Sequence, residues 1–362
     1  MKEILVYSLL VLSSLIFTSR IAAQYNEVEH EYLSFAADQD TKLMLSNKYG
    51  GIVCETWDKD SIGVQVTISS SSKKRESVSR IMNSVEIESI KFGNTVEVET
   101  SFRDNASLIK SYLGKLDPFN SNELTIEYVV SSPDGIDMEI INRFGNVSIE
   151  QSKSDIDIDL EYGDLRLESM AGDLKLRLKS GRLSGRKLKR AEFDARNYDI
   201  RLKYIDYALL ELNHCDVKVD EIDFARIDLV GGELDLDEVN TVSGFANANA
   251  DINIELLNKD LELEVKNSAV MIEEFDEKVS TVIINEVSST IDLNISNFSF
   301  SLEADVEESQ FSVPKSISNI ERVVHDERKQ SRTISFSYGV DNVEKCLFKL
   351  TGQKGSIFLI ED

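Results

Sequence analysis

The feature that most constrains the fold is a repeat of about 18 residues that runs through the middle and the later part of the chain. Short runs alternate apolar and polar residues, as at Ile156–Leu160 and Leu174–Leu178, which is the period-2 pattern of strands. The residue that follows the last apolar position recurs at nearly constant intervals, at Asn142, Glu161, Lys179, Arg196, Asn213, Val230, Asn249, Lys266, Asn285 and Glu303. A coil of short sides and corners produces this regularity, and such coils stack about 4.8 Å apart.

The period predicts an all-β fold, a single-stranded parallel β-helix (β-solenoid) with coils of about 18 residues. An early copy at Leu45–Val53 is separated from the coil at Asn142 by an excursion at about 57–130. Within it, Lys73–Val85 has apolar residues at helical spacing, which predicts one short helix, and Phe102–Ser121 is expected to be a loop. A polar segment at about 314–331 is expected to be a second loop.

The beginning of the chain is typical of a secretory signal peptide. Lys2 precedes an apolar run at Ile4–Phe17, and small residues follow it up to Ala23. This order predicts a signal peptide at 1–23, because the apolar core is shorter than the about 20 residues of a membrane span. An uncleaved anchor is the alternative. We therefore expect a lead-in at 24–40 and a β-solenoid domain at 41–362, with no membrane span in the mature chain.

Charge and cysteine content narrow the partners and the chemistry. The formal net charge is −25, which repels phosphate backbones and argues against nucleic acid as a partner. The cysteines are Cys54, Cys215 and Cys346, and three cannot all pair within one chain. We expect buried or free thiols. We predict that Cys54 and Cys215 are not bonded to each other. If Asn47 and Asn142 lie on neighbouring coils, five steps of about 4.8 Å separate two residues that a disulfide would hold within about 7 Å.

Two short copies carry a resemblance to a known family. Asn47-Lys48-Tyr49-Gly50 recurs as Asn142-Arg143-Phe144-Gly145, and this organisation resembles the putative adhesin family of bacterial surface and exported β-helical domains. A strand ending near Pro133 and a final strand at Gly355–Ile357 also match its layout. The resemblance covers about 41–362, although copies after Gly163 mostly lose the aromatic–glycine pair. It implies a parallel β-helix with an adhesin-like role and no catalytic residues.

Residue patterns that would indicate catalysis or metal binding are weak. His214 and Cys215 are adjacent, so on a strand they point to opposite faces and cannot hold one ion. Gly231–Asp237 is only loosely similar to a calcium-binding nonapeptide, because it lacks the third glycine and does not recur. A solvated strand face is the favoured interpretation. No catalytic residue, metal or cofactor is predicted.

Basic residues are concentrated between Leu174 and Arg190, and the period separates them into two groups. Lys175, Arg177 and Lys179 stand one period after Asp157, Asp159 and Glu161, and Lys175 and Arg177 stand one period before Glu192 and Asp194. Neighbouring coils would then pair opposite charges. The pairing leaves Arg182, Arg186, Lys187, Lys189 and Arg190, which we predict as a candidate binding patch for an anionic glycan or lipid head group.

Asparagines also recur near the corners, and we expect them to be structural. They are Asn142, Asn197, Asn213, Asn249, Asn267 and Asn285. Asparagine tolerates the left-handed backbone of tight corners and hydrogen-bonds its own turn.

These observations predict an exported, non-enzymatic, adhesin-like binding or surface-structural protein of a bacterial envelope. It would pass the inner membrane and reach the periplasm, the outer surface or the medium. The expected partner is an envelope glycan or another surface protein. The alternatives are a polysaccharide-active β-helix enzyme and an inert surface spacer. The even coils leave little room for cleft walls, which disfavours the enzyme.

Overall fold

The computed structural model describes residues 24–103, 124–339 and 346–361, and these form two units. The smaller comprises Met1–His30, Thr67–Glu86 and Phe102–Thr125, and the larger comprises Glu31–Val66, Ile87–Ser101 and Ile126–Asp362. The predicted signal peptide at 1–23 and the loop predicted at 102–121, from residue 104 onward, lie outside the described residues.

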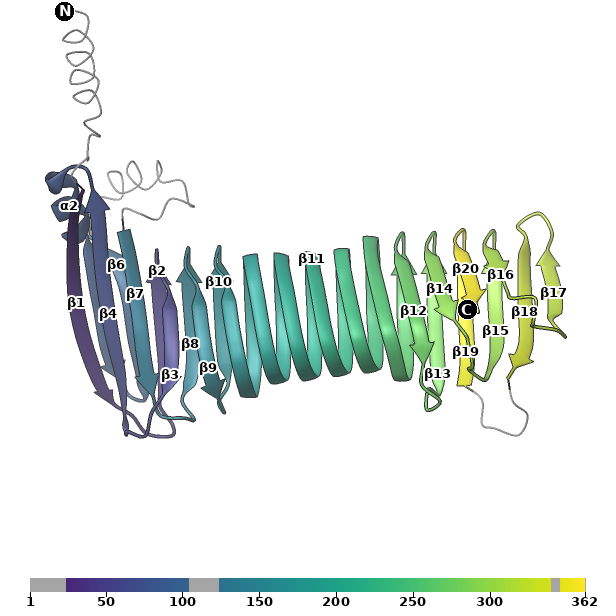
Figure 1. Ribbon diagram of the computed structural model, residues 1–362, viewed down its shortest axis with the longest axis horizontal. Helices are drawn as coiled ribbons and strands as arrows, with labels where there is room; N and C mark the ends of the chain where they lie inside the picture. Colours follow the sequence, from purple (N-terminus) through teal and green to yellow (C-terminus); the bar gives the residue numbers. More distant parts are fainter. Residues whose placement is uncertain (1–23, 104–123, 340–345, 362) are drawn as a thin grey trace, which may run out of the picture. The chain divides into compact units, whose positions relative to one another are not determined.

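Twenty strands and one helix make up the described chain (Figure 1). The elements are β1 (Tyr25–Ala36), β2 (Lys42–Lys48), β3 (Ile52–Thr56), β4 (Ser61–Ser72), α2 (Arg75–Met82), β5 (Val85–Phe92), β6 (Thr95–Phe102), β7 (Leu124–Ser132), β8 (Asp137–Arg143), β9 (Val147–Ser152), β10 (Ile156–Glu161), β11 (Leu165–Lys266), β12 (Ala269–Phe275), β13 (Thr281–Val287), β14 (Thr290–Asn294), β15 (Phe300–Glu307), β16 (Gln310–Ser312), β17 (Glu321–Asp326), β18 (Ser331–Tyr338), β19 (Cys346–Gln353) and β20 (Ser356–Ile360).

The smaller unit contains the helix. Val78 and Met82, one helical turn apart, are buried and form the apolar face of α2. The helix ends at Asn83, whose N–H donates to the carbonyl of Ser79 at 3.1 Å. It occupies the segment whose spacing predicts a helix, although the last apolar residue of that pattern, Val85, already begins β5.

In the larger unit, successive turns of the chain stack on one another, and we call each turn a rung. Ile156 in β10 is paired with Met138 in β8 on one side and with Leu174 in β11 on the other, and both pairings are parallel. The register therefore advances by one period of the sequence repeat at each rung, and side chains of one parity stack inside. Ile140, Ile158 and Leu176 belong to such a row and are fully buried, because alternate residues of a strand face opposite sides.

One corner of the rungs has left-handed backbone at equivalent positions. Positive φ angles occur at Tyr49, Phe144, Tyr162, Ser180, Asn197, His214, Gly231, Asn249, Asn267 and Ser288. In the first rungs a glycine follows this position, and a Cβ on Gly145 would collide with the carbonyl oxygen of Gly50. Most of the corners predicted from the sequence lie just before these positions.

The fold class expected from the sequence, a single-stranded parallel β-helix, is corrected by the strand pairing. The strands form one 20-stranded sheet that is mixed, because β18 pairs antiparallel with both β15 and β17. Chain order and stacking order also differ. β19 lies between β13 and β15, and β20 lies between β14 and β16. Period-2 alternation specifies the buried face of a strand but neither its direction nor its partner, so the sequence did not reveal these features.

Two further expectations meet the structure. The segment expected as a loop at about 314–331 contains β17, whose six residues are all exposed. Cys54, Cys215 and Cys346 are free and buried, which confirms the expected thiols and the absence of a Cys54–Cys215 bridge. Within the described residues, no helix has the length and apolar character needed to cross a bilayer.

Candidate binding surface

Opposite charges meet between neighbouring rungs on the outer face. Asp157, Asp159 and Glu161 are in register with Lys175, Arg177 and Lys179, as the period of the sequence predicts. The ion pairs themselves are partly diagonal. Arg177 contacts Asp157 at 2.6 Å, whereas Arg143 contacts both Asp159 at 3.0 Å and Glu161 at 3.5 Å. Long side chains reach past the directly opposite residue, so the register was predictable but the individual pairs were not.

Two of the five predicted patch residues also have partners in neighbouring rungs. Arg182 contacts Asp164 at 2.8 Å, and its backbone N–H donates to the same carboxylate at 3.1 Å. Arg190 lies 3.9 Å from Asp173 and 4.3 Å above the Tyr207 ring. Both acids stand one rung earlier in the chain. The expectation that rung pairing leaves Arg182 and Arg190 without partners is therefore wrong. The sequence period was applied only to residues within strands, whereas the partners Asp164 and Asp173 lie at corners.

The other three patch residues, Arg186, Lys187 and Lys189, are exposed. Within the described residues, no ion pair is found for them. They flank the buried Leu188 in the sequence, and all three side chains are on the solvent side of the rung. Arg186 also lines an open groove that contains Glu150 and Glu168. These three cations differ from Arg182 and Arg190 in having no acidic partner among the described residues.

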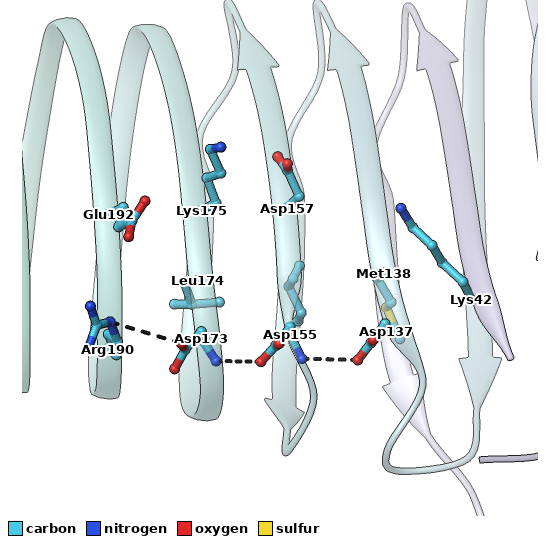
Figure 2. Close-up of a pocket in the computed structure, with 11 residues that line it drawn as sticks. Lys42, Asp137, Met138, Asp155, Asp157, Asp173, Leu174, Lys175, Arg190 and Glu192 are labelled. Carbon is cyan, nitrogen blue, oxygen red and sulfur yellow. Dashed lines mark hydrogen bonds and ion pairs between the residues drawn. The ribbon is translucent and has the colours of Figure 1, made fainter. Parts of the chain in front are cut away.

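A second groove, of about 340 Å³, follows the corner at which several rungs begin (Figure 2). Asp137, Asp155 and Asp173 form a row in it, and Arg190 continues the row. The N–H of Asp155 donates to Asp137 at 3.3 Å, and that of Asp173 donates to Asp155 at 2.9 Å. Asp137 and Asp155 thus each cap the next rung through one carboxylate oxygen, which stabilises the stack.

The histidines and cysteines of the described residues are either hydrogen-bonded or buried. They contain no group of three His, Cys, Asp or Glu side chains that could hold a metal ion. His214 and His325 each hydrogen-bond a nearby side chain, Asn213 and Thr333 respectively, at 2.7 Å. Burial raises the pKa of both Cys54 and Cys346 to about 12. These thiols therefore stay protonated at neutral pH, where only a thiolate is a good nucleophile.

Sequence reasoning used one group of residues only as a family motif and did not consider it as a site. At the left-handed corner, the Tyr49 and Phe144 rings stack at 5.6 Å, and Phe144 and Tyr162 stack at 5.2 Å. The ammonium groups of Lys48 and Lys179 lie over Tyr49 and Tyr162, at 4.9 Å and 5.7 Å from the ring centroids. The signal was present in the sequence: aromatic residues recur at this corner and then give way to small and polar ones.

Comparison with known proteins gives neighbours in structure alone. No family model and no curated protein matches the chain. Similar solved structures include a putative cell adhesion protein from Clostridium sporogenes, with 13% identity, 93% of this chain and 100% of that chain covered, and a TM-score of 0.18. A putative adhesin from Bacteroides fragilis has 11% identity, coverage of 92% and 97%, and a TM-score of 0.26. A putative lipid binding protein from Parabacteroides distasonis has 14% identity, coverage of 72% and 97%, and a TM-score of 0.30.

Two of these neighbours are described as a putative cell adhesion protein and a putative adhesin, the class that the sequence resembles. At these identities and TM-scores, the similarity assigns no function to this chain.

Proposed function

We propose that this chain is an exported, non-enzymatic, adhesin-like protein that binds a component of the bacterial envelope through its exposed surface. The observation that carries the proposal is the group of Arg186, Lys187 and Lys189, which are exposed and, among the described residues, have no ion pair, on a chain of net charge −25. A chain with this excess of acidic residues is soluble without basic residues at this place, so solubility does not explain the cluster. A local cluster of this kind favours an anionic partner, such as an acidic envelope glycan or an acidic patch of another surface protein.

A binding role agrees better with the surface than catalysis does. The row of aspartates in the groove of Figure 2 is engaged in capping the rungs. General acid–base catalysis needs groups within hydrogen-bond reach of a reacting atom and with pKa values near the working pH. The buried, protonated thiols of Cys54 and Cys346 do not meet that requirement.

The test replaces Arg186, Lys187 and Lys189 together with serine and measures binding of the full mature chain to a panel of envelope glycans and surface proteins. We expect about a three- to hundredfold loss of affinity at low ionic strength, because exposed charges contribute about 0.2–1 kcal/mol each. The loss of affinity should become smaller as salt is added, because salt screens exposed charges. The Debye length is about 10 Å at 0.1 M ionic strength.

The matched control is the serine triple variant of Lys259, Lys266 and Lys349, which are also exposed and whose removal changes the net charge equally. Equal losses in both variants would reduce the effect to net charge and reject the patch. Turnover of a glycan that is abolished by changing one carboxylate would reject the non-enzymatic function. A chain that binds no member of the panel would support the spacer.

A further inference from the structure

Two strands late in the sequence are inserted between rungs that precede them. β19 lies between β13 and β15, and β20 lies between β14 and β16, always in parallel register. We call β19 and β20 the inserted rung. Its corner is hydrogen-bonded to both neighbouring corners. The Ser288 N–H donates to the Gln353 carbonyl at 2.8 Å, and the Lys354 N–H donates to the Glu307 carbonyl at 3.0 Å.

A buried carboxylate occupies this junction of three corners. Glu286, near the end of β13, is 1% exposed. Its Oε2 accepts from the Ser289 N–H at 3.1 Å, and its Oε1 accepts from the Ser309 hydroxyl at 3.1 Å. The Gly355 N–H donates to the same hydroxyl at 3.2 Å. Glu286 thus joins the corner of β13 and β14 to that of β15 and β16, across the inserted rung.

The inserted rung is packed directly on the Glu286 carboxylate. A Cβ at Gly355 would lie 2.1 Å from Oε2, and one at Gly352 would lie 2.8 Å from Oε1. Neither glycine has a left-handed backbone, so the close approach of the carboxylate, rather than a turn, requires glycine at both positions. Val265, the register partner of Glu286 in β11, is buried as well. The carboxylate therefore reaches water only when the inserted rung moves away.

No cation balances this carboxylate, since no basic side chain of the described residues forms an ion pair with it. The charged residues of the adjoining corners are Lys266, Glu307, Glu308 and Lys354. Three of them are exposed, and the fourth, Glu307, lies 3.9 Å from Lys329. The hydrogen-bond donors around Glu286 favour its ionised form, but burial outweighs them and raises its pKa above the ordinary value.

We propose that Glu286 is a pH-sensitive latch of the inserted rung, which is held closed while the carboxyl is protonated and loosens when it ionises. Opening exposes the carboxyl to water and returns its pKa to the ordinary value of 4.5. The closed rung therefore binds the proton more tightly than the open rung. Closure is most favourable below the pKa of the open state and weakens as the pH rises through the higher pKa of the closed state.

The latch goes beyond the proposed function, because it needs no ligand and lies on other rungs than Arg186, Lys187 and Lys189. The experiment measures hydrogen exchange of the full mature chain at pH 4 and pH 7 by mass spectrometry, after correction for the intrinsic exchange rates. The signal is the opening of β19 and β20 relative to β10, which reports opening elsewhere in the stack. In the wild type this ratio should rise with pH, by up to about tenfold for each pH unit between the two pKa values, because opening releases one proton.

Two variants test the carboxylate, and a third is the control. Glu286→Gln cannot ionise, so the relative opening of the inserted rung should be the same at both pH values. Gly355→Ala places a Cβ against Oε2 and should increase the opening at both pH values. Glu262→Gln, at an exposed strand position, should keep the pH trend of the wild type.

A pH trend in Glu286→Gln equal to that of the wild type would overturn the latch. Wild-type protection of β19 and β20 in Gly355→Ala would do the same, because the carboxylate would then not fill the junction. An increase that β10 shares in full would show that the whole stack opens and would also reject the latch. The serine variant of Arg186, Lys187 and Lys189 tests the proposed function separately, so the two can fail independently.

Discussion

Polar side chains are enclosed at two distant points of the larger unit, at equivalent inward positions of the rungs. Asn142 donates from Nδ2 to the carbonyl of Gly145 at 2.9 Å and to that of Gly50 at 3.1 Å. Glu286 is 1% exposed and accepts from the Ser289 N–H and the Ser309 hydroxyl, each at 3.1 Å. Both side chains replace an apolar residue of the row and satisfy backbone or hydroxyl groups of the corner, because unpaired polar groups are costly in a core.

Glu286→Gln should increase stability at neutral pH and have less effect in acid. Burial raises the pKa of Glu286 above its ordinary value of 4.5. The folded state therefore holds the proton more tightly than the unfolded state. The resulting stabilisation is complete below the unfolded pKa and is lost as the pH rises through the folded pKa. An uncharged glutamine does not lose it, so we expect Glu286→Gln to unfold at a higher temperature than the wild type at pH 7.

The measurement is thermal unfolding of both proteins at pH 4 and pH 7, with Glu262→Gln at an exposed strand position as the control. The difference between Glu286→Gln and the wild type should grow with pH, whereas Glu262→Gln should show no such trend. A Glu286→Gln variant that is less stable than the wild type at pH 7 would mean that the ionised carboxylate is well solvated by its partners.

Strands and corners were predictable from the sequence to different degrees. The alternation of Ile156–Leu160 and Leu174–Leu178 predicts the step of one period that pairs Ile156 with Leu174, because this information is local. The place of β19 and β20 was not predictable. Thr281 pairs with Leu347, several periods further along the chain, and nothing in a local period reports such a distance. The same limit applies to the candidate site. The basic residues could be identified from the sequence, but the acidic partners of Arg182 and Arg190 are known only from the structure.

Removal of the last two strands should destabilise the chain far more than removal of an edge strand. β19 and β20 lie between earlier rungs, so a chain ending at residue 339 leaves β13 and β14 without neighbours on one side and separates them from β15 and β16. Apolar side chains such as Phe348 and Leu350, which are buried, are lost with them. Fully burying one such side chain contributes about 1.5–3 kcal/mol, so we expect loss of cooperative unfolding around the C-terminal rungs.

The control replaces Glu321–Asp326, the exposed strand β17, with a short glycine–serine linker. β17 pairs with β18 and buries none of its six residues, so its removal should change the unfolding midpoint by only a few degrees. Both shortened chains are compared by urea unfolding and by hydrogen exchange. Equal effects would contradict the interior position of β19 and β20.

At the scale of the whole molecule, excess negative charge opposes the short-range ion pairs. The chain has 65 acidic and 40 basic Lys and Arg residues, and many described basic side chains already contact an acid, as Arg143, Arg177 and Lys218 do. Exposed pairs contribute a median of about 0–1 kcal/mol each. The remaining acids repel one another across the surface, and this repulsion destabilises the compact state.

Salt should therefore stabilise the protein at pH 7, since screening weakens the repulsion among many unpaired acids more than the attraction within close pairs. Raising NaCl from about 10 mM to about 300 mM shortens the Debye length from about 30 Å to below about 8 Å, and the midpoint of thermal unfolding should rise by several degrees. Near pH 4.6, the isoelectric point that the sequence predicts, repulsion and attraction are closer to balance, so the same addition should have little effect or lower the midpoint. The measurement is a thermal unfolding series at the two pH values, repeated in sodium fluoride to separate screening from specific chloride binding. A midpoint that falls with salt at pH 7 would show that the ion pairs between rungs outweigh the net charge.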